Sequence, residues 1–156
     1  MKAAAGSAAL TQDSPRLTGK ELRKRAPRES HAEWEPAAGR DPLGILFKQA
    51  ESRVQDLLPI RYGRMSASPF AFYRGGAAIM AADLANTPDT GVRVQACGDA
   101  HISNFGGYAA PDRKLVFDLN DFDETLPAPW EWDVKRMAAS AVIAARENGA
   151  TKKISR

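Results

Sequence analysis

The chain has 156 residues, of which 44% are hydrophobic, so it is long enough to form one modest domain with a buried core. Its formal net charge of +3 is too small to indicate a nucleic-acid partner, and its single cysteine, Cys97, excludes an internal disulfide framework. No apolar run approaches the roughly 20 residues that a membrane-spanning helix needs. These features favour a cytoplasmic protein that binds neither a membrane nor a nucleic acid.

Residues 1–40 carry many charges and few large apolar side chains. Their basic side chains gather in one cluster, formed by Lys20, Arg23, Lys24, Arg25 and Arg28. A segment of this kind buries too little apolar surface to fold, so we expect a disordered basic leader over residues 1–40. A nucleic-acid-binding arm is the alternative, but no aromatic residue interleaves with the basic cluster to stack on bases.

A first helix is predicted after this leader, over residues 42–58. Asp41 can cap it, Pro42 suits its first position, and Pro59 stands where it should end. Apolar residues recur between these limits at helical spacing and form one stripe, made of Leu43, Leu46, Phe47, Ala50, Val54, Leu57 and Leu58.

A loop and a second helix are expected next. The loop covers residues 61–69 and carries Arg61 and Arg64. The helix covers residues 70–86, where apolar side chains again share one face. Its small residues at 75–78 would let another element approach closely.

Two short strands and a long helix complete the prediction. Residues 92–97 alternate between apolar and polar side chains, and residues 114–120 follow a turn, so both are strand candidates. The helix is expected over residues 130–147, with Gly149 as its C-terminal stop. We therefore expect an α+β fold in which helices pack on a short antiparallel sheet.

Polar residues are densest in and beside the predicted strands, in residues 97–104 and 115–124. These two segments hold Asp99, His101, Asn104, Asp118, Asn120, Asp121, Asp123 and Glu124. Burying several carboxylates is costly unless cations or hydrogen-bond donors compensate them. A divalent metal would do so, and oxygen ligands from Asp and Asn suit Mg²⁺.

The spacing of these residues indicates phosphoryl transfer. Asn104 follows Asp99 by five positions, and a hydrophobic strand then ends at Asp121, as in kinase catalytic and metal-binding loops. Asp99 would orient the attacking hydroxyl, and Asn104 and Asp121 would hold Mg²⁺ after a hairpin brings the two segments together. Asp123 is a second candidate ligand or the partner of a basic residue. Asp118 competes with Asp121, because the strand register is open.

The motif Gly98-Asp99-x-His101-x-x-Asn104 resembles the catalytic loop of the aminoglycoside and choline kinase branch. Asp121-Phe122-Asp123 is similar to the metal-binding segment that reads Asp-Phe-Gly in protein kinases. This resemblance implies part of a protein-kinase-like fold that uses ATP and Mg²⁺ and transfers phosphate to a hydroxyl-bearing acceptor.

A closer resemblance, over about residues 41–149, is to the uncharacterised bacterial domain-of-unknown-function 2252 family. The blocks that carry it are residues 64–65, 68–70, 72–75, 97–101, 104–106, 120–125 and 132–136. Members of that family are longer and carry a glycine-rich stretch and a lysine after these blocks. Here no lysine lies between Lys48 and Asp99, and the phosphate-cradling loop is missing. We therefore expect residues 41–150 to be an incomplete kinase-like domain with a tail at 151–156, an N-terminal fragment that is inactive alone.

Four further residues receive expected roles. Arg64 and Arg74 would contact phosphate in place of the missing lysine, or else pair with the carboxylates. His101 would orient Asp99 by a hydrogen bond, or is a packed histidine. Asp133 is expected to bond the catalytic loop.

Three functions are compatible with this set of residues. The first is an ATP- and Mg²⁺-dependent phosphotransferase, and the second is a pseudokinase or binding module that transfers nothing. The third is a metal-dependent phosphoester hydrolase, against which the single nearby histidine argues, because such enzymes use two metal ions. Apolar faces left exposed in an incomplete domain would also favour self-association.

Overall fold

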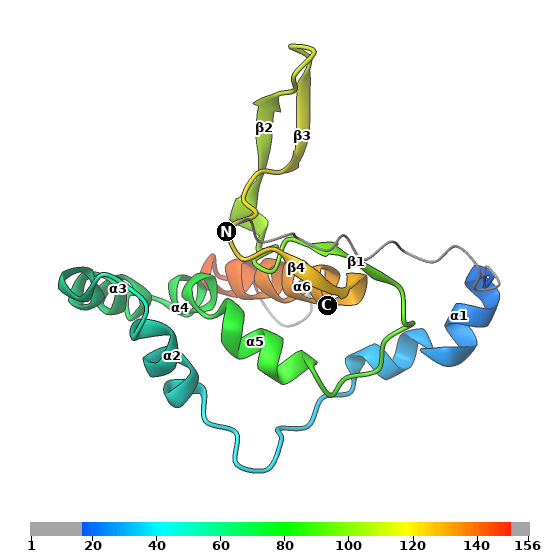
Figure 1. Ribbon diagram of the computed structural model, residues 1–156, viewed down its shortest axis with the longest axis horizontal. Helices are drawn as coiled ribbons and strands as arrows, with labels where there is room; N and C mark the ends of the chain where they lie inside the picture. The colour runs from blue at the N-terminus through cyan, green and yellow to red at the C-terminus, as the bar shows by residue number, and fades with distance from the viewer. Residues whose placement is uncertain (1–16, 151–156) are drawn as a thin grey trace, which may run out of the picture.

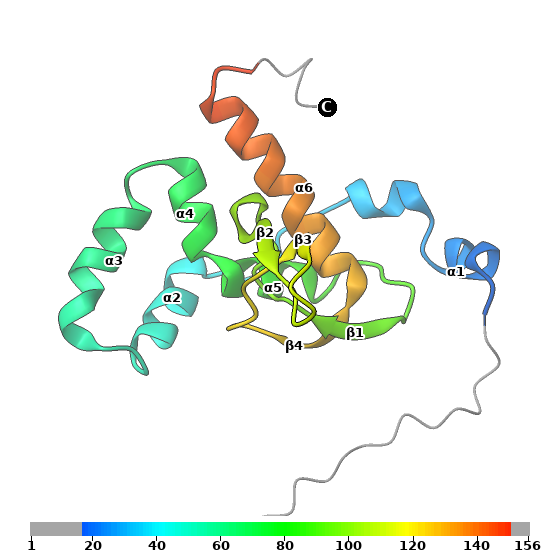
Figure 2. The same ribbon diagram turned by 90° about the horizontal axis from the view of Figure 1, so that it is seen from above.

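The computed structural model describes residues 17–150, which form an α+β arrangement of six α-helices and two small antiparallel sheets. Figure 2 shows the helices of residues 42–75 on one side of the long C-terminal helix and the N-terminal helix on the other. The predicted α+β class is confirmed. Within the described residues, no helix is long and apolar enough to cross a membrane.

The first described elements are α1 (Gly19–Arg25) and the short 3₁₀ helix η1 (Arg28–Ala32). Thr18 and Glu21 form a reciprocal capping box at the start of α1: the Glu21 amide donates to Thr18 Oγ1 over 3.3 Å, and the Thr18 amide donates to Glu21 Oε2 over 2.7 Å. The expectation of disorder through residue 40 is therefore wrong for these two helices. Residues 1–16 and 151–156, which the predicted leader and tail include, lie outside the described part.

The first predicted long helix is two helices. α2 (Pro42–Ala50) starts as predicted, because Asp41 accepts a hydrogen bond from the Gly44 amide. After the 3₁₀ turn η2 (Gln55–Leu57), α3 (Leu58–Met65) begins with Pro59 in its first turn. Pro59 thus starts a helix rather than ending one, since a helix tolerates proline where the amide would be unpaired. The loop predicted for residues 61–69 is largely helical for the same reason.

The second predicted helix is also divided, into α4 (Pro69–Gly75) and α5 (Ala77–Leu84), with the buried Gly76 at the break. The buried core that joins α2, α3 and α5 contains Leu46, Met65 and Ile79. A Cβ atom at Gly75 would lie 2.6 Å from Met65 Sδ, so a larger residue there would require the Met65 side chain to move. The close approach predicted from the small residues is therefore present.

The four strands form two separate sheets. β1 (Arg93–Ala96) pairs with β4 (Leu126–Pro129), and β2 (Phe105–Ala109) pairs with β3 (Leu115–Leu119). Both pairs are antiparallel, and the β2–β3 hairpin stands away from the rest of the molecule (Figure 1). The sequence predicted β1 and β3 as strands but neither β2 nor β4, and the prolines of β4 argue against a strand.

The long helix α6 (Trp130–Glu147) lies across the middle of the molecule and contacts α4, α5 and β1. It begins and ends where the sequence predicted, and Gly149 takes a positive φ of 83° after it. Because its N-terminal half lies beside β1, its polar side chains reach the loop that follows this strand.

Candidate functional site

The two acidic segments lie against each other at the base of the β2–β3 hairpin. The Asn120 amide donates to the Asn104 carbonyl over 3.0 Å, and Cys97 Sγ donates to the Asp121 carbonyl over 3.0 Å. Gly98 has a φ of +85°, and a Cβ atom there would clash with the carbonyl oxygen of Glu124. The hairpin therefore joins residues 97–104 to residues 120–124, as the sequence predicted.

Asp133 fixes the loop from the first turn of α6. Its two carboxylate oxygens accept hydrogen bonds from the Cys97 amide over 2.7 Å and from the Gly98 amide over 3.1 Å. Charge-assisted bonds of this kind are about twice as strong as neutral ones. The structure thus contains the predicted bond between Asp133 and the loop at residues 97–104.

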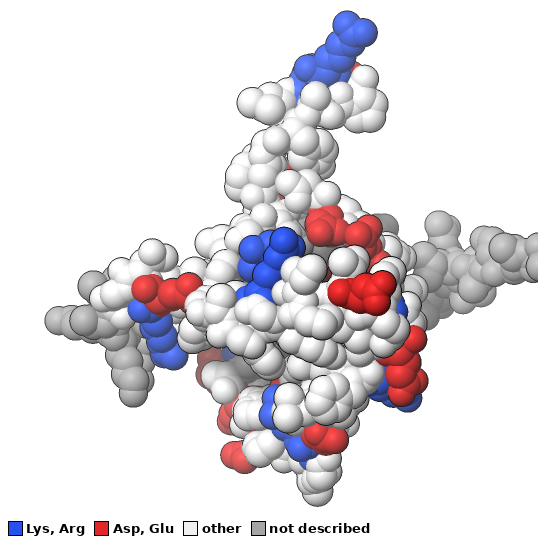
Figure 3. Space-filling view, turned by 90° about the vertical axis from the view of Figure 1, so that its left-hand side faces the viewer, with Lys and Arg blue, Asp and Glu red and all other residues white. Residues whose placement is uncertain are grey.

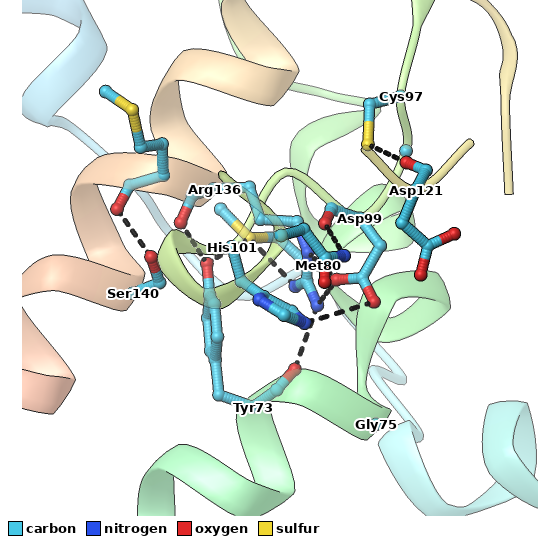
Figure 4. A network of polar contacts seen from close by, with 12 residues as sticks. Tyr73, Gly75, Met80, Cys97, Asp99, His101, Asp121, Arg136 and Ser140 are labelled. Atoms are coloured by element: carbon cyan, nitrogen blue, oxygen red, sulfur yellow. Dashed lines mark hydrogen bonds and ion pairs between the residues drawn. The ribbon is translucent and has the colours of Figure 1, made fainter. Parts of the chain in front are cut away.

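Asp99 is paired with Arg136 of α6 in the interior (Figure 4). Asp99 Oδ1 accepts hydrogen bonds from Arg136 Nε, over 2.6 Å, and from Arg136 Nη2. The side chains of Arg136 and Asp99 are only 2% and 13% exposed. The sequence prediction missed Arg136, although it stands three residues after Asp133 and hence on the same face of the helix.

Tyr73 of α4 completes this network. Arg136 Nη2 donates to the Tyr73 carbonyl over 2.9 Å, and the guanidinium carbon lies 4.5 Å from the centre of the Tyr73 ring. The Tyr73 hydroxyl in turn donates to the Arg136 carbonyl over 2.9 Å. Burial raises the pKa of Tyr73 to about 12, so its hydroxyl keeps its proton at neutral pH. The position of Asp99 thus depends on both α4 and α6.

His101 is buried beside Asp99, with its Nε2 atom 3.7 Å from Asp99 Oδ2. Its Nδ1 atom is buried and has no hydrogen-bond partner among residues 17–150. Burial lowers the pKa of His101; the Asp99 carboxylate opposes this shift, and the Arg74 and Arg136 charges add to it. The neutral imidazole is therefore favoured at neutral pH.

A cavity of about 840 Å³ opens in front of Asp99 and His101, between α3 and α4. Arginines are frequent among the residues that line it: Arg53, Arg61, Arg64 and Arg74. The structure thus places the predicted Arg64 and Arg74 in one cavity with Asp99 and His101. Figure 3 shows the side of the molecule that carries α3, where basic and acidic side chains lie next to each other below the hairpin.

Arg53 and Arg61 were not predicted as site residues. Arg61 Nη2 donates to the Gly75 carbonyl over 2.9 Å, which ties α3 to the end of α4. Burial and the nearby Arg53 charge lower the pKa of Arg61, while Glu124 and Asp99 raise it. The sequence prediction missed these two because it put Arg61 in a loop and continued the first helix through Arg53.

The predicted metal ligands Asn104, Asp121 and Asp123 do not line this cavity. The buried Asn104 donates from Nδ2 to the Asp99 carbonyl over 2.8 Å, which leaves its Oδ1 as the acceptor. Asp121 Oδ1 accepts a hydrogen bond from the Asp123 amide over 3.2 Å. The competing Asp118 lies on β3 and bonds the Leu119 amide.

These residues offer oxygen atoms that could bind a metal ion, but they do not form a complete coordination shell. In residues 17–150, no three His, Cys, Asp or Glu side chains are placed to hold a metal ion together. Burial raises the pKa of Glu124, and the Asp99 and Asp121 charges raise it further, so these carboxylates share one negative field. The donor set suits Mg²⁺, which commonly takes one or two protein carboxylates and completes its shell with water and phosphate oxygens.

No curated protein and no solved structure matches the chain. A family model does match, over residues 53–156, and it describes an uncharacterized protein conserved in bacteria. The matched region includes all the site residues discussed above and covers more than half of the chain. The chain therefore belongs to the DUF2252 family.

Proposed function

We propose that this chain contributes the catalytic loops of an ATP- and Mg²⁺-dependent phosphotransferase that acts on a hydroxyl group. What supports the proposal is one juxtaposition: Asp99 lines a cavity that also contains four arginines, and its loop packs beside a second loop, residues 120–124, that carries carboxylates. Phosphoryl transfer needs a carboxylate to orient the acceptor, oxygen ligands for the metal and positive charge around the reacting anions, and such groups lie near one another here.

We assign to Asp99 the role of binding and orienting the acceptor hydroxyl. Its Oδ1 atom is bound by Arg136, so Oδ2, on the side of His101, is the oxygen that can accept a hydrogen bond from a substrate. The ion pair with Arg136 holds the Asp99 carboxylate in place and makes it a rigid positioning group. That suits phosphoryl transfer, whose loose transition state needs orientation of the nucleophile more than early removal of its proton.

We assign to Asn104 and Asp121 the role of metal ligands. The neighbouring Asp123, which is exposed, is the further candidate ligand. When bound, Mg²⁺ would neutralise charge on the phosphates of ATP. Arg64 and Arg74 supply positive charge near Asp99, and neutral His101 packs beside its carboxylate.

The test measures ATP binding to the protein by calorimetry, with and without Mg²⁺. Asp121→Asn removes one charge from the proposed metal site and should weaken Mg²⁺-dependent ATP binding at least tenfold. Asp118→Asn is the matched control, because Asp118 lies on the hairpin outside the proposed site. This variant should bind ATP with the same Mg²⁺ dependence as the unmodified chain. Equal Mg²⁺-dependent affinity in the Asp121 variant and the unmodified chain would refute the metal assignment.

A binding module without catalysis is the second candidate. It is favoured because the two central side chains already have partners within the protein. Asp99 accepts hydrogen bonds from Arg136, and Asn104 donates to the Asp99 carbonyl. Such a module would bind ATP but release no γ-phosphate, and measurable phosphate release abolished by Asp99→Asn would exclude it. Hydrolysis by two metal ions receives less support, because no three acidic, His or Cys side chains of residues 17–150 converge on even one ion.

A further inference from the structure

The cavity beside Asp99 has an unusual balance of charge. Its lining includes four arginines, and within residues 17–150 none of them makes an ion pair. Asp99 is the one acidic residue among the described lining residues, and Arg136 already neutralises it. The cavity therefore presents more positive than negative charge, although Glu124, which lies outside its lining, also acts favourably on Arg53 and Arg61.

Two of these charges lie close enough to repel each other. The lowered pKa of Arg61 has burial as its first cause and the Arg53 charge as its second, while the Glu124 and Asp99 charges oppose this shift. Arg61 is also held in place by the Gly75 carbonyl, so it cannot move freely into water. A multiply charged anion would relieve this repulsion and could receive hydrogen bonds from several guanidinium groups at once.

The cavity is not only basic. Val54, Leu57 and Ile60 lie along it with more than half of each side chain exposed. The buried His101 adds a polar group without a partner at Nδ1 among the described residues. The volume of the cavity, about 840 Å³, falls in the range of small-molecule sites, which typically combine apolar walls with a few polar groups.

The place of the cavity relative to the acidic loops indicates which substrate it would hold. Asp99 and His101 line it, whereas the proposed metal residues Asn104 and Asp121 do not. In a kinase-like site the metal ligands lie beside the nucleotide phosphates, and the catalytic aspartate lies beside the acceptor. The arginine-lined cavity is thus on the acceptor side.

We propose that this cavity selects an organic dianion, in the simplest case a phosphate ester whose apolar body also carries a hydroxyl group, and that this hydroxyl is the phosphoryl acceptor. Its oxygen would bond to the γ-phosphorus of ATP as the bond to the β–γ bridging oxygen breaks, ADP would leave, and the hydroxyl proton would pass to water. The identification of the dianion as the acceptor rests on the proposed function, whereas its binding does not. Cationic acceptors, as in the aminoglycoside and choline kinases that the loop resembles, do not suit a cavity with four arginines.

Three probes with one aromatic body and different charges test this proposal: phenyl phosphate, benzyl alcohol and 2-phenylethylamine. Binding to the chain is followed by NMR titration, with EDTA present and without nucleotide. Phenyl phosphate should bind, the neutral alcohol more weakly, and the amine not at all. Arg61→Gln and Arg64→Gln should each weaken phenyl phosphate binding about tenfold, which is the effect of losing one charge-assisted contact.

Arg146→Gln is the matched control, because Arg146 is exposed near the end of α6 and outside the cavity. Arg64 is included because it is exposed, so its variant should fold even where loss of the Arg61–Gly75 bond disturbs α4. Equal binding of the amine and the phosphate, or unchanged affinity in Arg64→Gln, would overturn the inference. Phenyl phosphate binding in a protein that fails the Mg²⁺–ATP test would uphold the anion site and remove its role as acceptor site.

Discussion

Arg136 and Asp99 form an ion pair that is almost completely removed from water, and its energetics differ from those of a surface pair. Surface pairs contribute little, whereas removing one member of a buried pair leaves a charge without compensation. The predictable part of this site was the acidic loop, whose spacing is local in sequence. Its basic partner could not be identified from Asp99 alone, because the pairing depends on how α6 is rotated against α4 and β1.

Arg136→Met should lower the free energy of unfolding by about 3–5 kcal/mol, because the Asp99 carboxylate then stays buried without a counter-charge. Urea denaturation measures this loss. The double variant Asp99→Asn with Arg136→Met should recover part of it, since the uncompensated charge is gone. A loss in the single variant no larger than that of an exposed substitution such as Arg146→Met would contradict the buried-pair description.

At the scale of elements, the turn at Gly98 connects β1 to the acidic loop and packs on the backbone of Glu124. Periodicity predicted β1, β3 and α6, because each has a pattern that its own residues complete. It predicted one helix over residues 42–58 followed by a loop, where α2 ends at Ala50 and α3 begins at Leu58, because proline both ends and starts helices. It missed β4, because the pairing of prolines with β1 is a tertiary effect that local preference opposes.

Gly98→Ala should destabilise the protein more than the backbone conformation alone requires. A left-handed conformation costs a non-glycine residue roughly 1–2 kcal/mol, and here the new methyl group also meets the Glu124 carbonyl. Gly39→Ala is the matched control, because Gly39 has a φ of +72° and nothing within 4 Å of its added Cβ. Thermal or urea unfolding should show a clearly larger loss at Gly98. Equal losses at both sites would mean that the two loops do not pack as described.

At the scale of the whole molecule, the β2–β3 hairpin is the feature with the least support from its surroundings (Figure 1). Leu115 and Phe117 are 82% and 75% exposed, and two-stranded hairpins are marginally stable on their own. The sequence predicted one short sheet and exposed apolar faces, but not that the strands would divide into two sheets. That division follows from long-range pairing between β1 and β4, which no local pattern encodes.

We expect the exposed apolar side of this hairpin to drive self-association, and analytical ultracentrifugation across a range of protein concentrations would measure it. Replacing Leu115 and Phe117 by serine should shift the protein toward monomer, because apolar area is removed from the exposed face. Leu43→Ser is the control, since Leu43 is also exposed but lies on α2. An unmodified chain that stays monomeric at every concentration would disprove the expectation.

The prolines of β4 have a consequence for how molecules of this protein can join. The Trp130 amide donates to the Val92 carbonyl, so alternate residues of the strand, including Pro127 and Pro129, direct their backbone nitrogens to the opposite edge. Those nitrogens carry no hydrogen, so an incoming strand would find no donors at two successive outward positions. Growth of a β-ribbon from this sheet is blocked at β4, so strand addition between copies would have to use β1 or an edge of the hairpin.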